Sequence, residues 1–345
     1  MIFRQLFDAT SSTYTYILAS RRGAEAVIID PVLERVDQYL RVLEELDCRL
    51  VKAVDTHVHA DHITGLGALR DKTRCITVMG DESSADVVSM RVREGDSIDV
   101  EGVTLGVMYT PGHTNDSYSY LMGDRVFTGD TLLIRGTGRT DFQHGDAAAQ
   151  YDSLFNKLLK LPSETLVFPA HDYKGETVST IGEEIAFNPR LQVSSVGAYV
   201  EIMNGLNLAD PKMIAVAVPA NQQIGARQSD DEDSSWALSA KDAISQLGGA
   251  DTLLVDLREE RERARDGIIP NSVHAPYKTL GDFVRPGGML HYEVVQGGKQ
   301  IVFYCAYGER SVLAVRTAQE AGLDNVCHLI GGLGAWIAEG GMLDR

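Results

Sequence analysis

The most informative stretch of the sequence reads LVKAVDTHVHADHITG from Leu50 to Gly65. Its apolar first part is typical of a buried strand. The polar part that follows carries three histidines and two aspartates between Asp55 and His62. An ordinary core has little use for so many imidazoles and carboxylates, because each needs a polar partner once it is buried. The stretch therefore predicts a metal site on a loop at the end of a strand.

Three further apolar runs, each short enough for one strand, lead into another histidine or aspartate: His113, Asp130 and His171. Segments with a helical pattern lie between the runs, at 33–46 and 147–161. Strands that alternate with helices predict an α/β fold. Four strand ends that deliver ligands are difficult to attribute to chance, so we expect them to meet at one site.

The composition is that of a globular protein without a nucleic-acid or membrane partner. The 345 residues carry a formal net charge of −17, which disfavours binding to phosphate backbones and to anionic membrane surfaces. No apolar run approaches the roughly 20 residues of a membrane helix, and the N-terminus lacks a signal-peptide pattern. Four cysteines without a C-x-x-C pair are too sparse for a disulfide framework. We therefore expect a cytoplasmic protein.

The chain divides at an acidic stretch. Residues 228–235 read QSDDEDSS and contain no apolar side chain, which is typical of a solvated linker. We predict a first domain over 1–225, a linker over 226–236 and a second domain over 237–345. In the second domain, strand-like and helix-like segments alternate again at 240–247, 252–257, 300–304 and 310–321. This pattern predicts a small α/β domain with a parallel sheet.

The second domain contains a candidate nucleophile. Cys305 follows an apolar strand and precedes a helix, so its sulfur is expected at a helix N-terminus and near Arg310. Backbone N–H groups and a guanidinium stabilise a thiolate or persulfide there. The spacing from Cys305 to Arg310 is C-x4-R, a loop sized for a sulfane sulfur. The residues between them are expected to contact the substrate: Ala306, Tyr307, Gly308 and Glu309.

The motifs of the first domain resemble the metallo-β-lactamase superfamily, an αββα sandwich with its metal site at one edge of the two sheets. The segments that carry a further resemblance, to the persulfide dioxygenase branch, are 56–65, 138–143, 169–173 and 217–221. That resemblance implies one Fe(II) per chain, held by the residues that match the ligands of the branch: His57, His113 and Asp130. The other motif residues would surround these ligands without binding the iron: His59, Asp61, His62 and His171.

Two imidazoles and one carboxylate leave three positions of an octahedral iron open for substrate and dioxygen. By the same resemblance, Arg139 and Tyr173 would contact the glutathione part of a glutathione persulfide. A structural interpretation is equally open for both, with Arg139 paired to Asp141 and Tyr173 packed beside His171. Thr137 stands where the family usually has a cysteine.

The Cys305 loop and several flanking motifs resemble the rhodanese family. Together the two resemblances imply a bifunctional enzyme of sulfur metabolism. Fe(II) and O2 would oxidise glutathione persulfide to sulfite and glutathione, while a Cys305 persulfide would carry sulfane sulfur between thiosulfate and glutathione. We also expect a homo-oligomer, a dimer or a tetramer.

Two alternatives stay open. The dinuclear hydrolases of the superfamily bind two metals through the same seven residues, so the chain could be a di-zinc thioester hydrolase of glyoxalase II type with an accessory rhodanese domain. A non-enzymatic persulfide sensor or carrier is the other alternative, with a reactive Cys305 and a closed four-ligand zinc site. Residue identity does not distinguish one metal from two.

Overall fold

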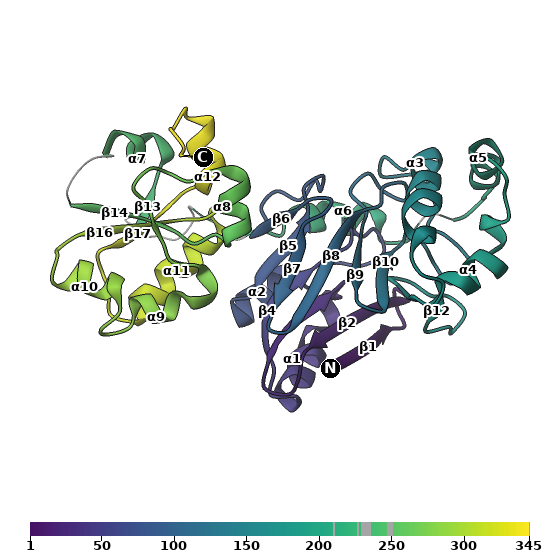
Figure 1. Cartoon of the computed structure of the whole chain (residues 1–345), viewed down its shortest axis with the longest axis horizontal. Coiled ribbons are helices and arrows are strands. Elements are labelled where there is room, and N and C mark those ends of the chain that lie inside the picture. The colour runs from purple at the N-terminus through teal and green to yellow at the C-terminus, as the bar shows by residue number, and fades with distance from the viewer. Residues whose placement is uncertain (210, 226–227, 229–235, 247–250, 345) are drawn as a thin grey trace. The chain divides into compact units, whose positions relative to one another are not determined.

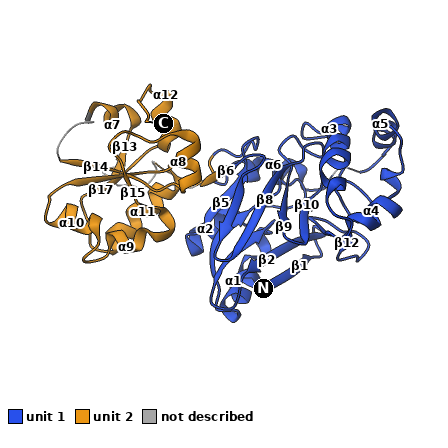
Figure 2. Ribbon diagram, viewed as in Figure 1, with its two compact units in different colours: residues 1–86, 91–224 blue, residues 87–90, 225–345 orange. Residues whose placement is uncertain are grey.

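The computed structural model describes residues 1–345 except 210, 226–227, 229–235, 247–250 and 345. The chain forms two compact units (Figure 2), the first of residues 1–86 and 91–224 and the second of residues 87–90 and 225–345. Most of the expected linker lies outside the described residues, and the domain limits given above stay predictions. Among the described residues, no helix is both long enough and apolar enough to cross a bilayer.

The first unit is built on two six-stranded sheets (Figure 1). The strands of the first sheet, in spatial order, are β1 (Ile2–Asp8), β2 (Thr13–Ala19), β3 (Glu25–Ile29), β4 (Arg49–Val54), β5 (Ile76–Gly80) and β6 (Met90–Val92). Those of the second are β12 (Ser179–Thr180), β11 (Leu166–Pro169), β10 (Arg125–Gly129), β9 (Tyr118–Met122), β8 (Val103–Tyr109) and β7 (Ser97–Val100). The four strands that were expected to lead to ligands are therefore present.

Aromatic side chains join the two sheets. Tyr16 of β2 packs on Phe127 of β10 with 4.9 Å between ring centroids, and Phe3 of β1 packs on Phe168 of β11 at 4.8 Å. Such offset or tilted ring pairs stabilise a core beyond the area that they bury. The inner faces of the two sheets therefore form one core.

Helices cover the outer faces of both sheets. The first sheet carries α1 (Val36–Glu45) and α2 (Leu66–Thr73), and the second carries α3 (Ala147–Asp152), α4 (Ile181–Phe187) and α5 (Val196–Asn204). The helix expected over 147–161 is confirmed in position, but after α3 it continues as a π-helical turn, Ser153–Lys157, and a 3-10 turn, Leu158–Lys160. A last helix, α6, spans Ile214–Gln222. The unit has the αββα order of layers that the resemblance to the metallo-β-lactamase superfamily implied.

The second unit contains one five-stranded sheet in which every strand pair is parallel. In spatial order its strands are β13 (Ala237–Leu238), β17 (Val326–Leu329), β16 (Gln300–Tyr304), β14 (Thr252–Asp256) and β15 (Val273–His274). Its helices are α7 (Ala240–Gln246), α8 (Glu260–Asp266), α9 (Leu280–Val284), α10 (Met289–Val295), α11 (Glu309–Glu320) and α12 (Gly332–Ala338). The expected parallel sheet is confirmed.

Apolar side chains cover both faces of this sheet, as a parallel sheet requires. Val255, Phe303 and Val315 belong to the core under α9 and α11, while Val302 and Trp336 belong to the core under α7 and α12. The Cys305 loop follows β16 directly, so the packed sheet fixes the position where this loop begins.

Candidate metal centre and thiol loop

Three of the predicted ligands form a compact cluster. His57 follows β4, His113 follows β8 and Asp130 follows β10, so three different strand ends deliver them. Their ligand atoms all lie within 4.8 Å of one another, and all three residues are buried. Two imidazoles and one carboxylate at this spacing can hold one metal ion and leave part of its coordination shell open.

A glycine beside one of these ligands sets its direction. Gly129 ends β10 with φ +52°, and a Cβ at this position would lie 2.8 Å from Thr56 Oγ1. Glycine adopts this left-handed conformation more readily than other residues, because it has no Cβ. It turns the chain out of the strand, so that Asp130 faces the other ligands while the backbone passes close to Thr56.

Hydrogen bonds fix which nitrogen of each imidazole faces the cluster. Thr56 Oγ1 donates to Asp30 Oδ2 at 3.1 Å, so His57 donates from Nδ1 to Thr56 Oγ1 at 2.9 Å. His113 donates from Nδ1 to the carbonyl of Arg139 at 2.7 Å. Each ring therefore keeps the lone pair of Nε2 for the site, an arrangement that is typical of metal-binding histidines.

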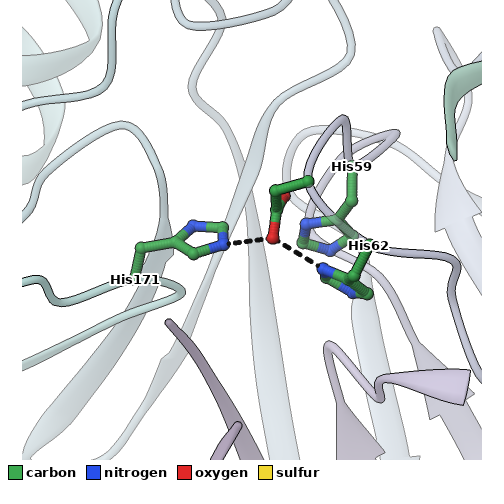
Figure 3. Close-up of side chains that lie close together, drawn as sticks. His59, His62 and His171 are labelled. Carbon is green, nitrogen blue, oxygen red and sulfur yellow. Dashed lines mark hydrogen bonds and ion pairs between the residues drawn. The ribbon is translucent and has the colours of Figure 1, made fainter. Parts of the chain in front are cut away.

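The remaining predicted residues form a second group beside the first: His59, Asp61, His62 and His171. Figure 3 shows a carboxylate oxygen between His62 and His171, and this oxygen is Asp61 Oδ2, which lies 2.9 Å from His62 Nδ1 and 2.9 Å from His171 Nε2. His171 also donates from Nδ1 to Asp130 Oδ1 at 2.7 Å. His171 thus connects the second group to a ligand of the first.

The carboxylates and imidazoles of the two groups shift one another's pKa values. Burial alone lowers the pKa of His171, but Asp130 and Asp61 raise it well above its usual value. Burial raises the pKa of Asp61 and Asp130, but the histidines around them hold both well below the ordinary range. Burial and the neighbouring imidazoles lower the pKa of His57, which leaves that ring neutral and able to bind a metal.

Two buried nitrogens support a metal in this region. Within the part of the chain that the structure describes, His59 Nδ1 and His62 Nε2 have no hydrogen-bond partner, although both are shielded from solvent. Leaving buried polar atoms unsatisfied is costly unless an ion or water meets them. The residues present therefore fit a metal ion, although these two nitrogens do not decide between one ion and two.

Sequence reasoning missed Asp30. This carboxylate follows β3, accepts from the Thr56 N–H at 2.7 Å and lies 3.2 Å from His59 Nε2. Burial raises its pKa to about 6, against the opposing effect of His57. The sequence did contain a signal for Asp30. It directly follows the apolar run 26–29, just as the other candidate ligands follow apolar runs.

The first cluster opens into a pocket of about 250 Å³. Apolar side chains line part of it: Leu133, Ile134, Phe142, Leu208 and Pro211. Arg139 lines it as well, and its guanidinium contacts both carboxylate oxygens of Asp141 at 2.6 Å. Tyr173 is 71% exposed and stacks on His171 at 6.1 Å with an interplanar angle of 4°. Both residues thus have the structural contacts that the sequence allowed and also border the pocket.

Three other cations in the pocket wall were not predicted, and one of them, Arg135, pairs with Glu184. Arg190 donates to the carbonyl of Thr137, and Lys174 is exposed at the rim. Among the described residues, neither has a carboxylate in contact. Nothing local in the sequence marks them as site residues, because 35 or more positions separate both from Arg139 in the chain.

The candidate nucleophile is fully buried. Cys305 accepts a hydrogen bond from the Gly308 N–H at 3.1 Å, and its exposure is 0%. Gln228 covers the loop by donating to the Tyr307 carbonyl at 2.7 Å and accepting from the Gly331 N–H at 2.7 Å. The expected backbone donor to sulfur is present, and the loop lies closed over it.

Arg310 has a partner that the sequence did not reveal. Its guanidinium binds both carboxylate oxygens of Glu262, at 2.7 and 2.6 Å, with both residues buried. Glu309 is also buried and accepts from Ser89 of the same unit. His144 is exposed and belongs to neither ligand group.

Comparison with known proteins adds two family matches and several relatives. Residues 9–171 match the model of the metallo-beta-lactamase superfamily, and residues 239–339 match that of the rhodanese-like domain. The chain is 45% identical over 230 residues to the persulfide dioxygenase ETHE1 of Mus musculus and to that of Homo sapiens. Each of these matches covers 66% of this chain and 90% of the relative.

Solved structures agree. The crystal structure of ETHE1 from Myxococcus xanthus is 55% identical, with a TM-score of 0.63, and the match covers 64% of this chain and 98% of that one. A metallo-beta-lactamase from Staphylococcus aureus matches 96% of this chain and 99% of its own length, with a TM-score of 0.61. Its sequence identity is 22%, so this second likeness concerns the fold alone.

Proposed function

Because this chain belongs to the ETHE1 persulfide dioxygenase family, within the metallo-beta-lactamase fold, and carries a rhodanese-like domain after it, we propose that it oxidises glutathione persulfide and transfers sulfane sulfur. One molecule each of glutathione persulfide, O2 and water yields glutathione and sulfite. Both oxygen atoms of O2 end in the sulfite, and water supplies the third.

The observation that carries the dioxygenase proposal is the buried cluster of His57, His113 and Asp130 beside the pocket. These three residues would hold one Fe(II). When bound, ferrous iron supplies open coordination positions for a sulfur ligand and dioxygen and the electrons that activate dioxygen. His57 donates to Thr56 Oγ1 and His113 donates to the Arg139 carbonyl, which keeps the Nε2 lone pair of each ring directed into the site. Asp130 is oriented by the hydrogen bond that it accepts from His171.

The pocket wall supports an anionic substrate. Glutathione persulfide carries two carboxylates, and the whole chain carries a net charge of −17 that repels them. Arg190 and Lys174 offer cations that no carboxylate contacts among the described residues. We propose that they bind the carboxylates together with Arg139 and Tyr173, while Leu133 and Phe142 exclude water from the sulfur.

In the second unit, Cys305 would perform the transfer. Its thiolate attacks the outer sulfur of thiosulfate, the sulfur–sulfur bond of the donor breaks, and sulfite leaves with the bonding electrons. The glutathione thiolate then attacks the outer sulfur of the Cys305 persulfide and leaves as glutathione persulfide. The Gly308 N–H and the start of α11 stabilise the negative sulfur in both states.

Substitution of one residue in each unit tests whether the first unit oxidises persulfide and the second unit transfers sulfur. We expect His113→Ala to reduce O2 uptake on glutathione persulfide by at least about 100-fold, because one iron ligand is lost. The same variant should transfer sulfur from thiosulfate to glutathione at the wild-type rate. Cys305→Ser should abolish sulfur transfer, because a serine hydroxyl forms no persulfide. It should leave O2 uptake on glutathione persulfide at the wild-type rate.

Metal analysis of anaerobically purified protein completes the test. About one iron per chain supports the dioxygenase, whereas two zincs per chain together with thioester hydrolysis would support the hydrolase. A Cys305→Ser variant that fails to consume O2 when glutathione persulfide is supplied directly would contradict the assignment of oxidation to the first unit. A wild-type protein that turns over no persulfide and holds a closed zinc site would support the sensor.

A further inference from the structure

A threonine hydroxyl lies among the residues that could hold a second metal. Thr13 Oγ1 is 3.1 Å from Asp61 Oδ2, 3.3 Å from His62 Nδ1 and 3.1 Å from His171 Nε2. Thr13 is fully buried, with 0% exposure. One side chain thus contacts three of the four residues of the second ligand group.

The backbone holds Thr13 in this place. It begins β2 and forms an isolated β-bridge with His171. On either side of it, Tyr14 N–H donates to the Ala170 carbonyl at 2.7 Å and Asp172 N–H donates to the Ser12 carbonyl at 3.2 Å. The chain before β2 is therefore fastened to the loop that carries His171, and Thr13 cannot leave without breaking these bonds.

A short hydrogen-bond chain fixes the hydroxyl. Thr13 gives its one proton to Asp61 Oδ2, so Ser11 Oγ donates to Thr13 Oγ1 at 2.7 Å. The backbone N–H of Ser11 donates to Asp8 Oδ2 at 2.8 Å. Asp8 in turn accepts from Arg35 at 2.7 Å. Since threonine is β-branched and has few rotamers, the hydroxyl is held in the orientation that faces Asp61.

A second ion bound to Asp61 Oδ2 and His171 Nε2 would need to lie about 2.0–2.2 Å from each atom. On the side of Thr13 it would either collide with the hydroxyl oxygen or take it as a neutral ligand, and in both cases the hydrogen bonds of Thr13 to Asp61 and His171 are lost. On the other side it would turn the lone pairs of both ligands away from the hydroxyl, which would then be buried without its partners. In both positions the ion competes with Thr13.

We infer that Thr13 is the residue that limits this centre to one metal ion. Its hydroxyl occupies Asp61 and His171 as hydrogen-bond partners, so that His171 stays available to orient Asp130 through Nδ1. The seven histidines and aspartates are compatible with two ions, and Thr13 selects one. This inference rests on the proposed function, in which His57, His113 and Asp130 hold a single iron.

The test measures bound metal rather than activity. Full-length wild type and Thr13→Val, which keeps the shape of the side chain without the hydroxyl, are incubated with excess Zn(II) and dialysed, and their zinc content is determined. We expect about one zinc per chain for wild type and about two for Thr13→Val. Thr13→Ser, which restores the hydroxyl, should return to about one.

Thr15→Val is the matched control. Thr15 lies on the same strand and is equally buried, but its hydroxyl contacts the Asp30 carbonyl and Tyr39 rather than a residue of the ligand groups. It should hold one zinc.

If Thr13→Val also holds one zinc while its circular dichroism matches that of wild type, the role of Thr13 is wrong and the single-metal proposal stands. If wild type holds two, the single-metal centre itself is wrong. Should Thr13→Val fail to fold, a Thr13→Ala variant that holds one zinc overturns the inference equally.

Discussion

The buried ion pair between Glu262 and Arg310 is the residue-scale feature with the largest expected effect on stability. Glu262 is 4% and Arg310 0% exposed as side chains, and the pair is bidentate. Removing one member of such a pair leaves an uncompensated buried charge. Because Arg310 lies in the first turn of α11, directly after the Cys305 loop, the pair fixes the helix start beside the transfer site as well as the fold.

We predict that Glu262→Gln lowers the unfolding free energy of the second unit by about 3–5 kcal/mol. Tryptophan fluorescence during urea unfolding measures this unit alone, since both tryptophans, Trp236 and Trp336, belong to it. Glu260→Gln on the same helix is the control, because Glu260 is 76% exposed and its loss should cost at most about 0.5 kcal/mol. Equal effects of both substitutions would contradict the role of the buried pair.

The same pair gives a pH dependence of known sign. Burial raises the pKa of Glu262, but the charge and hydrogen bonds of Arg310 hold it below its ordinary value of 4.5. The unfolded chain therefore takes up this proton at a higher pH than the folded chain does. The stabilisation is complete above about pH 4.5 and is lost as the pH falls through the folded pKa, so the difference between wild type and Glu262→Gln should shrink on acidification.

At the scale of elements, the end of β10 is the critical point of the metal centre. Gly129 has φ +52° and lies against Thr56, whereas Gly123, in the turn between β9 and β10, has φ +56° and nothing within 4 Å of an added Cβ. The two glycines share a conformation and differ in their surroundings. They therefore separate the cost of a left-handed residue from the cost of a collision.

We predict that Gly123→Ala costs about 1–2 kcal/mol of unfolding free energy through its positive φ and leaves one iron per chain. Gly129→Ala should cost more and should also lower the iron content severalfold, because the shift of Thr56 or of the strand end displaces Asp130 or His57. Far-UV circular dichroism during unfolding and iron analysis measure the two effects. Full iron occupancy in Gly129→Ala would show that the strand end adapts.

At the scale of the whole molecule, every candidate metal ligand comes from the first unit and both tryptophans come from the second. A ligand stabilises only the structure that binds it, by an amount that grows with the ratio of its concentration to Kd. We predict that removing the bound metal with a chelator lowers the midpoint of the first unit's part of the far-UV circular dichroism transition and leaves the tryptophan transition in place. Equal shifts of both signals would show that the two units unfold as one.

The strand and helix pattern, the order of the two folds and the chemistry of each site were readable from local sequence. His57, His113, Asp130 and His171 each follow an apolar run directly, and Cys305 lies between a strand and a helix. Such signals are local, because a strand and the residue at its end are neighbours in the chain. The candidate ligands were therefore visible as residues at strand ends, whereas the choice of His57, His113 and Asp130 as the iron ligands came from the family resemblance.

The side chains that contact these residues could not be predicted from the sequence. Thr13 meets His171 across 158 positions, Glu262 meets Arg310 across 48, and Gln228 meets Tyr307 across 79. No local pattern marks such pairs, because only packing brings the residues together. These contacts determine whether a ligand is free to bind, how a charge is balanced and whether a thiol is covered. Those properties depend on distance and burial, which arise when the chain folds.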